Sequence, residues 1–315
     1  MRIVHVTDRR YPPSADDGGA PQALASLCVE QQRQGHDVRV ATTARSDGPG
    51  VWSLGPHGSA TSSLLKRVRD EWVDVVHFHA LASEMQGILH VNGIPTVMHV
   101  HGTHHGHPLE GVNAIYVSRR HAEAHGAEVY VDNGIDIEGH RFQPRALDYL
   151  AFLGKVRRSK KGADIAVSVA NRTRRQLQLV GGRKFSIPQT WLPFQRRIKA
   201  LGVLGGEPKM AVLRDAAALL FPVRWEEPFG LVLIEAMASG TPVIAFNRGA
   251  VPDIVVDGVT GFVVDDFEQM CAAVGRIDEI DRAACRHHVA ERFSIERTAN
   301  GVMACYRRAI AGEQW

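Results

Sequence analysis

The sequence predicts an α/β protein made of two doubly wound parallel-sheet domains that face each other across a deep cleft. Its 315 residues suffice for about two domains of ordinary size. Short apolar runs alternate with amphipathic segments along most of the chain, which favours parallel sheets covered by helices. The pattern breaks at residues 134–148, where Asn-Gly, Pro144 and many polar residues interrupt it, and then restarts. In such domains ligands bind outside the carboxyl ends of the strands.

The first half contains six apolar runs that we expect to be strands. Pro21–Gln34 is predicted as a helix between the first two of them. Ser62–Trp72 is predicted as a second helix, with Leu64, Val68 and Trp72 on its apolar face and basic residues opposite, a pattern of core packing or of a membrane-surface helix. The expected strands are Ile3–Val6, Val38–Thr42, Val73–Phe78, Thr96–Val100, Ala114–Val117 and Glu128–Val131.

The second half repeats this rhythm and then becomes helical. We therefore predict an N-terminal domain over residues 1–140, a ligand-binding domain over 141–295, and a C-terminal helix over 296–315 that packs back towards the N-terminal domain. The expected strands are Tyr149–Leu153, Leu177–Val180, Ala217–Phe221 and Val243–Phe246, and the expected helices are 162–173, 207–215, 230–239, 266–275, 279–291 and 295–311.

Composition limits the protein's class. Apolar residues make up 44% and charged residues 23% of the chain, so neither disulfides nor a metal are needed for folding. The four cysteines lack C-x-x-C spacing, which fits a reducing compartment. The first residues lack the apolar core of a signal peptide, and no apolar run approaches the ~20 residues that cross a bilayer. We expect a cytoplasmic protein, with the inner face of the membrane as the alternative site.

Positive charge is clustered in three runs of the second half, at 157–161, 172–175 and 196–197. Such runs usually form solvated faces, and the functional alternative is attraction of a phosphate-bearing ligand or an anionic membrane. Nucleic acid is not expected as a partner, because few aromatic residues are interleaved with the basic ones.

Chemistry-bearing residues are densest in Ala217–Phe246. An apolar strand leads into Glu227 and Pro228, and Pro228 suits the first turn of the following helix. The amides just beyond it form an anion site, and Glu235 lies further along the same helix. Carboxylates suit hydroxyl groups, so a nucleoside diphosphate sugar fits this combination. The alternative is a self-capping helix with a solvated second glutamate.

Two glycine-containing loops offer further phosphate contacts. Gly154–Gly162 joins a predicted strand to a helix and carries Lys155 and Lys161, but lacks the Gly-Lys-Ser/Thr ending of a P-loop. Gly18 and Gly19 follow the first strand without a G-x-G-x-x-G pattern, which disfavours an NAD site.

Histidines are concentrated near one predicted strand end. We expect His99 and His101 to point to opposite faces of that strand, and one of them to hydrogen-bond a substrate hydroxyl. The loop residues His104, His105 and His107 allow a zinc alternative, which the absence of a carboxylate or cysteine partner disfavours. No metal or other cofactor is therefore expected.

Residues 227–245 closely resemble the Glu-x7-Glu signature of glycosyltransferase family 4, and the resemblance covers nearly the whole chain. Members of this family are retaining enzymes with the GT-B fold of two Rossmann-like domains. Weaker similarities, in the order expected for the family, are found at Gly18-Gly19, His99–Gly102, Asn133–Asp136, Phe142–Pro144 and Asp257–Val264.

The resemblance implies a role for each residue of the signature. Glu227 would hold sugar hydroxyls and Glu235 the ribose. The backbone amides of Phe229, Gly230 and Leu231 would face the sugar and the diphosphate.

Outside the signature, the resemblance implies that Lys155 and Lys161 neutralise the diphosphate. The family usually has arginine at the position of Lys155, and a lysine cannot make the planar two-pronged contact of arginine. Arg157 or Arg158 would then supply part of this clamp.

Further contacts are implied on the remaining segments. His101 would lie near the reacting side of the sugar, Gly18 and Gly19 near a phosphate, and Leu204 and Gly205 against the base.

We therefore predict a retaining, metal-independent hexosyltransferase that uses a nucleoside diphosphate sugar, UDP-linked by family frequency, and a small-molecule, glycan or lipid acceptor. A lipid acceptor would give the basic helix at 62–72 a role in peripheral membrane contact. Alternatives on the same fold are a nucleotide-sugar 2-epimerase, a disaccharide phosphorylase and a non-catalytic nucleotide-sugar-binding protein.

Overall fold

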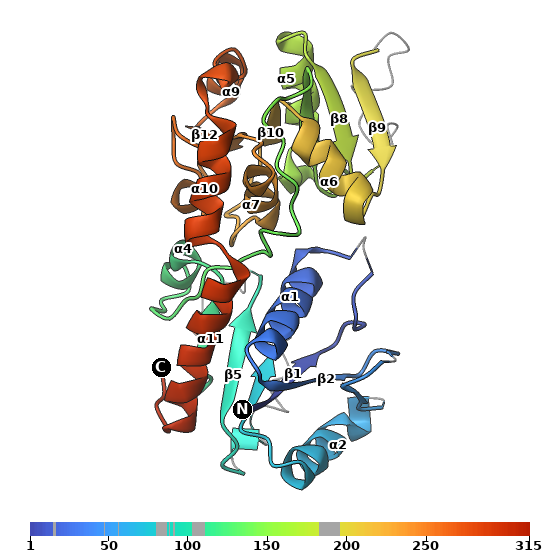
Figure 1. Cartoon of the computed structure of the whole chain (residues 1–315), viewed down its shortest axis with the longest axis vertical. Coiled ribbons are helices and arrows are strands. Elements are labelled where there is room, and N and C mark those ends of the chain that lie inside the picture. Colours follow the sequence, from blue (N-terminus) through green and yellow to red (C-terminus); the bar gives the residue numbers. More distant parts are fainter. Residues whose placement is uncertain are drawn as a thin grey trace. The chain divides into compact units, whose positions relative to one another are not determined.

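The computed structural model describes residues 1–14, 17–46, 48–55, 57–79, 87, 89–90, 92–102, 111–182 and 196–315. The chain divides into two compact units (Figure 1). Unit 1 contains Met1–Gly134 and Ile295–Trp315, and unit 2 contains Ile135–Ser294. The predicted divisions were after residues 140 and 295. His104, His105 and His107 lie outside the described residues.

Unit 1 is a parallel six-stranded sheet in the order β3-β2-β1-β4-β5-β6. This order places β1 between β2 and β4, so that β1, β4 and β5 are successive neighbours in the middle of the sheet. The strands are β1 (Arg2–Thr7), β2 (Asp37–Thr42), β3 (Val51–Ser53), β4 (Val75–Phe78), β5 (Thr96–Val100) and β6 (Ala114–Tyr116).

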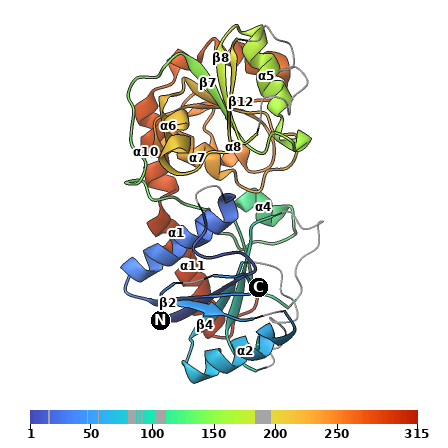
Figure 2. The ribbon, with the colours of Figure 1, turned by 90° about the vertical axis from the view of Figure 1, so that its right-hand side faces the viewer.

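Helices cover both faces of the unit 1 sheet. Helices α1 (Gly19–Arg33) and α11 (Ile295–Ile310) pack on one face, and α2 (His57–Asp70) packs on the other (Figure 2). A short helix, α4 (Arg119–Glu123), follows β6. The C-terminal helix is thus part of unit 1, where Tyr306 is fully buried against the sheet.

Unit 2 repeats the architecture with a six-stranded parallel sheet in the order β12-β11-β10-β7-β8-β9. Its strands are β7 (Tyr149–Leu153), β8 (Gln176–Val180), β9 (Ile198–Gly202), β10 (Ala218–Phe221), β11 (Val243–Phe246) and β12 (Gly261–Val264). Its helices are α5 (Ala163–Arg172), α6 (Gly206–Asp215), α7 (Leu231–Ala238), α8 (Val251–Ile254), α9 (Phe267–Val274) and α10 (Arg282–Arg292). The doubly wound α/β class predicted from the sequence is confirmed.

Two expectations about elements were wrong, and some strands were not predicted. Residues 128–131 form no strand, and Tyr130 makes only an isolated bridge to Tyr116. The second helix ends at Asp70, and Trp72 takes a left-handed conformation with 80% of its surface exposed, so it is not on the buried face. Strands β3, β9 and β12 were missed, and β3 has only three residues, too few for a periodic pattern.

Among the described residues, no helix is both long and apolar enough to span a bilayer.

Candidate functional site

Glu227 follows β10 in unit 2 and is 8% exposed. Its Oε2 accepts a hydrogen bond from Lys161 Nζ at 2.7 Å and another from Trp225 Nε1 at 3.0 Å. Lys161 also lies over the Trp225 ring, 4.9 Å from its centroid. The structure therefore brings together two of the residues predicted from the sequence, Glu227 and Lys161, and adds Trp225, which the sequence reasoning did not select.

A glycine allows the segments that carry Lys161 and Glu227 to lie close together. Gly162, at the start of α5, has φ +73°, and a Cβ atom there would lie 1.9 Å from the carbonyl oxygen of Pro222. Only a residue without a side chain allows the two backbones to approach so closely. This contact holds the end of the β7–α5 loop, with Lys161, beside the segment that carries Glu227.

The remaining basic residues of this loop are on its outer side. Lys155, Arg157 and Arg158 are exposed. Lys160, which the sequence reasoning did not choose, stacks on Trp225 with its Nζ 3.5 Å from the ring centroid. Burial, and then the neighbouring charges of Lys161 and Arg158, lower the pKa of Lys160. The loop is thus a concentrated source of positive potential.

The helix that follows Glu227 begins directly after a glycine. Phe229 is buried, Gly230 precedes α7 with φ +92°, and Leu231 is its first residue. No side chain in the described part of the chain caps this end. Uncapped amides at a helix N-terminus attract anions, and Glu227 places a carboxylate directly before them.

Glu235 lies about one turn along α7 and pairs with Lys209 of α6, with Nζ and Oε1 separated by 2.8 Å. Leu204 and Gly205 come immediately before α6, and both are partly exposed. Helices α6 and α7 pack side by side. The ion pair therefore holds the Glu235 carboxylate beside α6, the helix that directly follows the Leu204–Gly205 segment. Lys209 was missed because nothing in the sequence links it to a residue 26 positions away.

In unit 1, Gly18 and Gly19 form the start of α1. Gly18 is the residue before the helix and carries no side-chain cap, and a Cβ atom at Gly18 would meet nothing within 4 Å. The first turn of α1 also contains no acidic residue.

The other predicted residue of unit 1, His101, belongs to a cluster of five histidines. They come from the ends of the adjacent strands β1, β4 and β5, and their rings lie 4.2 to 5.7 Å apart where they pack. His99 and His101 stack with their planes only 8° apart. The expectation that they point to opposite faces was wrong, because side chains alternate along a strand and residues two apart share a face. The cluster consists of His5, His77, His79, His99 and His101.

Burial keeps this cluster uncharged. It lowers the pKa of His5 and of His101 to about 4. The pKa values of His77, His79 and His99 are well below the usual range because of burial first and neighbouring imidazoles second. At neutral pH all five rings are therefore neutral and each carries one N–H.

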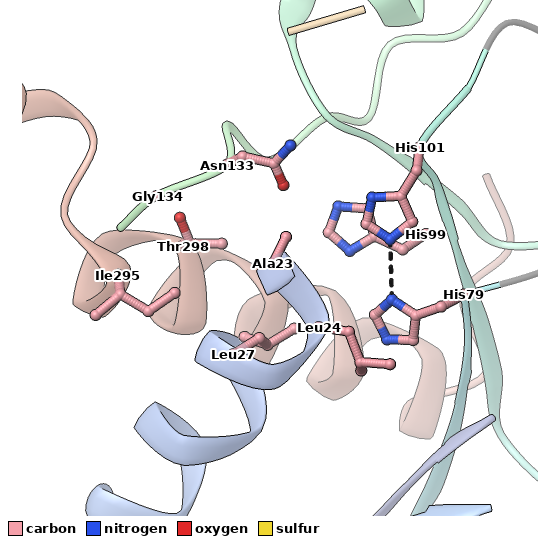
Figure 3. Close-up of a pocket in the computed structure, with 10 residues that line it drawn as sticks. All are labelled: Ala23, Leu24, Leu27, His79, His99, His101, Asn133, Gly134, Ile295 and Thr298. Carbon is pink, nitrogen blue, oxygen red and sulfur yellow. Dashed lines mark hydrogen bonds between the residues drawn. The ribbon is translucent and has the colours of Figure 1, made fainter. Parts of the chain in front are cut away.

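A small pocket borders the cluster (Figure 3). Its cavity of about 10 Å³ is room for about one water-sized group. Besides apolar residues of α1, it is lined by His79, His99, His101, Asn133 and Thr298, all of unit 1.

Among the described residues, two sets of three histidines could hold a metal ion. They are His5, His77, His79 and His79, His99, His101, with candidate ligand atoms within 4.8 Å of one another. The sequence reasoning considered only the later loop histidines and missed these sets, because their members come from three strands.

The comparisons with known proteins assign the family. The profile of the family described as Glycosyltransferase Family 4 matches residues 17–185, more than half of the chain. This chain belongs to glycosyltransferase family 4. The profile described as Glycosyl transferases group 1 matches residues 148–279.

Curated relatives of this family-4 chain match over part of its length. The D-inositol 3-phosphate glycosyltransferase of Segniliparus rotundus is 40% identical over 113 residues, which are 33% of this chain and 25% of that protein. The protein of the same name from Mycobacterium tuberculosis is 41% identical over 114 residues, 32% of this chain and 23% of the relative. The matched part thus spans about a quarter of the curated relatives.

Solved structures agree over the whole chain. AviGT4, a glycosyltransferase involved in avilamycin A biosynthesis, superposes with a TM-score of 0.76 at 25% identity and with 100% of both chains covered. HepE of Anabaena, in complex with UDP and glucose, gives a TM-score of 0.73 at 18% identity over 96% of this chain and 98% of HepE. The family-4 chain therefore has the GT-B fold expected from the sequence.

Proposed function

We propose that this family-4 chain is a retaining glycosyltransferase that moves a hexose-type sugar from UDP to an acceptor hydroxyl without a metal ion. The observation that carries the proposal is the state of Glu227. Lys161 and Trp225 both bind its Oε2, while Oε1 has no hydrogen bond to any part of the chain that the structure describes. A carboxylate oxygen fixed in this way beside the N-terminus of α7 suits a sugar hydroxyl attached to a diphosphate.

The choice of UDP rests on similarity. HepE, with the same fold, is described in complexes with UDP, with UDP and glucose, and with UDP-glucose. The curated relatives act on an inositol phosphate by name, so a cyclitol phosphate belongs in the panel of acceptors together with glycans and lipids.

In the proposed mechanism, negative charge develops on the departing diphosphate. The bond between the anomeric carbon and the diphosphate breaks, a bond to the acceptor oxygen forms on the same face, and the acceptor proton goes to the departing phosphate. Lys161, Lys155 and the amides of 229–231 stabilise the charge on the leaving group, and Arg157 or Arg158 adds to the clamp. Glu235 binds the ribose, and Leu204 and Gly205 contact the base. From unit 1, the family resemblance adds Gly18 and Gly19 as phosphate contacts and His101 as a contact of the sugar.

The test is donor turnover by the purified full chain. Release of nucleotide from labelled UDP-, GDP-, ADP- and dTDP-sugars is followed with and without acceptors. Glu227→Gln removes the charge that binds sugar hydroxyls and is expected to lower kcat/KM about 10²- to 10³-fold, the loss typical of one strong transition-state contact. The matched control, Glu268→Gln, changes an exposed glutamate of unit 2 and is expected to leave turnover unchanged.

Each outcome assigns a function. Product with retained anomeric configuration supports the proposal, and EDTA-treated enzyme is expected to keep its rate. An altered free sugar formed without acceptor would indicate an epimerase, and phosphate-dependent disaccharide cleavage a phosphorylase. Binding without turnover of any donor would indicate a non-catalytic protein. Full activity of Glu227→Gln would overturn the site assignment.

A further inference from the structure

Three of the clustered histidines are joined end to end by hydrogen bonds in unit 1. His5 Nε2 lies 2.8 Å from Oε1 of Gln31, a buried residue of α1. His5 Nδ1 lies 2.8 Å from His79 Nε2, and His79 Nδ1 lies 3.0 Å from His101 Nε2, the bond that is dashed in Figure 3. A continuous chain therefore runs from Gln31 to His101.

The side chain of Gln31 gives this chain a direction. Its Nε2 faces the sulfur of Met303 at 3.9 Å, which can only accept a hydrogen bond, and the hydroxyl of Tyr306 at 3.3 Å, which can accept one as well as donate. Its oxygen can therefore only accept, and His5 must donate from Nε2. A neutral imidazole has one N–H, so His5 Nδ1 accepts, His79 donates from Nε2 and accepts at Nδ1, and His101 donates from Nε2.

The direction decides what the last ring offers. With its hydrogen on Nε2, His101 has an unprotonated Nδ1. In Figure 3 this nitrogen is on the side of the ring away from the bond to His79. His101 is partly exposed and lines the pocket with Asn133 and Thr298, where there is space for one water-sized group of about 10 Å³.

We propose that Gln31, His5 and His79 are positioning residues that hold His101 as its Nε2–H tautomer, so that Nδ1 accepts a hydrogen bond from a ligand hydroxyl. The ligand is a polyhydroxylated sugar or cyclitol, and this part of the inference rests on the proposed function. A neutral acceptor selects a hydroxyl donor, whereas a protonated imidazole at the same place would attract phosphate.

The other two histidines of the cluster serve a different purpose. His77 bonds Tyr306 through Nδ1 at 2.6 Å, and neither nitrogen of His99 has a hydrogen-bond partner among the described residues. Their rings pack against those of His79 and His101. The hydrogen-bonded chain of Gln31, His5, His79 and His101 is called the relay below. A bound metal would spread the relay nitrogens, because two ligands of a tetrahedral zinc site are about 3.3 Å apart at Zn–N distances of about 2.0–2.1 Å. The observed 2.8 and 3.0 Å fit shared protons better.

The direct test is nitrogen NMR of the full chain labelled with 15N-histidine, with assignments from single substitutions. Long-range 15N–1H correlation at pH 7 distinguishes protonated from unprotonated ring nitrogens. We expect His5, His79 and His101 all to be protonated at Nε2 only. Protonation of His101 at Nδ1 would overturn the proposal, as would zinc-induced loss of these signals at one equivalent of metal, which would assign the cluster to a metal site.

Gln31→Met tests the origin of the direction, since it keeps the length of the side chain and removes the amide. We expect the His101 ring to become a mixture of both tautomers, with kcat/KM about two- to tenfold lower, the range for one hydrogen bond. Gln31→Glu keeps an acceptor for His5 and is expected to restore the Nε2–H tautomer. Gln34→Met changes an amide on the same helix that lies outside the relay and should alter neither readout. An unchanged tautomer in Gln31→Met would overturn the role of Gln31.

The two proposals fail differently. If the tautomer is as expected but no donor or acceptor shifts the His101 Nδ1 resonance, the ligand contact at His101 is wrong. If the resonance shifts while no sugar is transferred, the proposed transferase function is wrong and the relay stands.

Discussion

The two candidate regions of this family-4 glycosyltransferase use opposite electrostatic designs. In unit 2, Glu227 and Glu235 are each paired with a lysine on a neighbouring element, at 2.7 and 2.8 Å. In unit 1, five histidines, three of them buried and two partly buried, are neutral and are connected by hydrogen bonds or ring stacking. The charged region is suited to a diphosphate and to the hydroxyls of the sugar and ribose attached to it, and the neutral region is suited to hydroxyls alone. If this contrast is correct, the two regions should respond differently to substitution and to pH.

The largest effect is expected from removing a charge in unit 2. Lys161→Met takes away the cation that we propose neutralises the leaving diphosphate, so kcat should fall about 10²- to 10³-fold. Stopped nucleotide-release assays at saturating donor measure it. Lys199→Met, on the exposed surface of β9, should keep the rate. An equal loss in both variants would mean that general charge, rather than the pairing with Glu227, matters.

The backbone approach that supports this pair is the next target. Gly162→Ala would place a Cβ atom 1.9 Å from Pro222 O, so the loops must separate. We expect a loss of unfolding free energy of about 3 kcal/mol or more, combining strain at positive φ with a steric clash. Urea unfolding measures it. Gly258→Ala has the same φ of +73° but nothing within 4 Å, and should cost only about 1 kcal/mol. Equal losses of unfolding free energy in the two variants would show that the loops separate without an energetic cost.

The neutral histidines of unit 1 should make the stability of the protein depend on pH. His5 and His101 have folded-state pKa values of about 4, below the value of about 6.5 in an unfolded chain. Between these two values the unfolded state binds more protons, so stability should fall as pH falls from about 6.5 to 4, by up to about 1.4 kcal/mol per pH unit for each histidine. His79 and His99 shift in the same direction.

His101→Gln tests this dependence at the partly exposed end of the relay. In this variant, the difference between the unfolding free energies at pH 7 and pH 5.5 should be about 1 kcal/mol smaller than in the unsubstituted chain. The Gln34→Met control should preserve the original slope. A slope that is the same in both variants would contradict a neutral His101.

The smallest effect is expected at the second ion pair of unit 2. Lys209→Met leaves Glu235 without its partner, whose side chain is 19% exposed, so the carboxylate loses orientation rather than charge. Donor Kd should rise about two- to fivefold, as for a partly screened pair. Arg276→Met, which breaks an exposed pair with Glu279, should not change Kd. A larger loss than for Lys161→Met would reverse the assigned importance of the two pairs.

The same contrast explains what the sequence could predict. The Glu227–Glu235 signature is contiguous, so the strand, the loop, the helix start and both carboxylates could be located from the order of residues alone. Lys161 was found because its loop also lies between a strand and a helix. Trp225 and Lys209 were not found, since neither belongs to a spacing pattern, and their roles depend on which elements pack together.

The histidine relay was beyond sequence reasoning for a different reason. Gln31, His5, His79 and His101 come from four separate segments, and they meet only because the strand order puts β1, β4 and β5 side by side. The direction of the hydrogen bonds depends further on Met303 and Tyr306 of the C-terminal helix, which contributes to unit 1 from the far end of the chain. Only the alternation of side chains in β5 was available from the sequence, and it was applied incorrectly to His99 and His101.

We propose that Glu227 recognises the sugar of the donor rather than its nucleotide. Calorimetric titration of UDP and of UDP-glucose into the unsubstituted chain and into Glu227→Gln tests it most directly. We expect UDP-glucose to bind the unsubstituted chain more tightly than UDP does. Glu227→Gln should remove this difference and leave the Kd of UDP unchanged. A parallel loss of affinity for both ligands, or an undiminished preference for UDP-glucose, would contradict it.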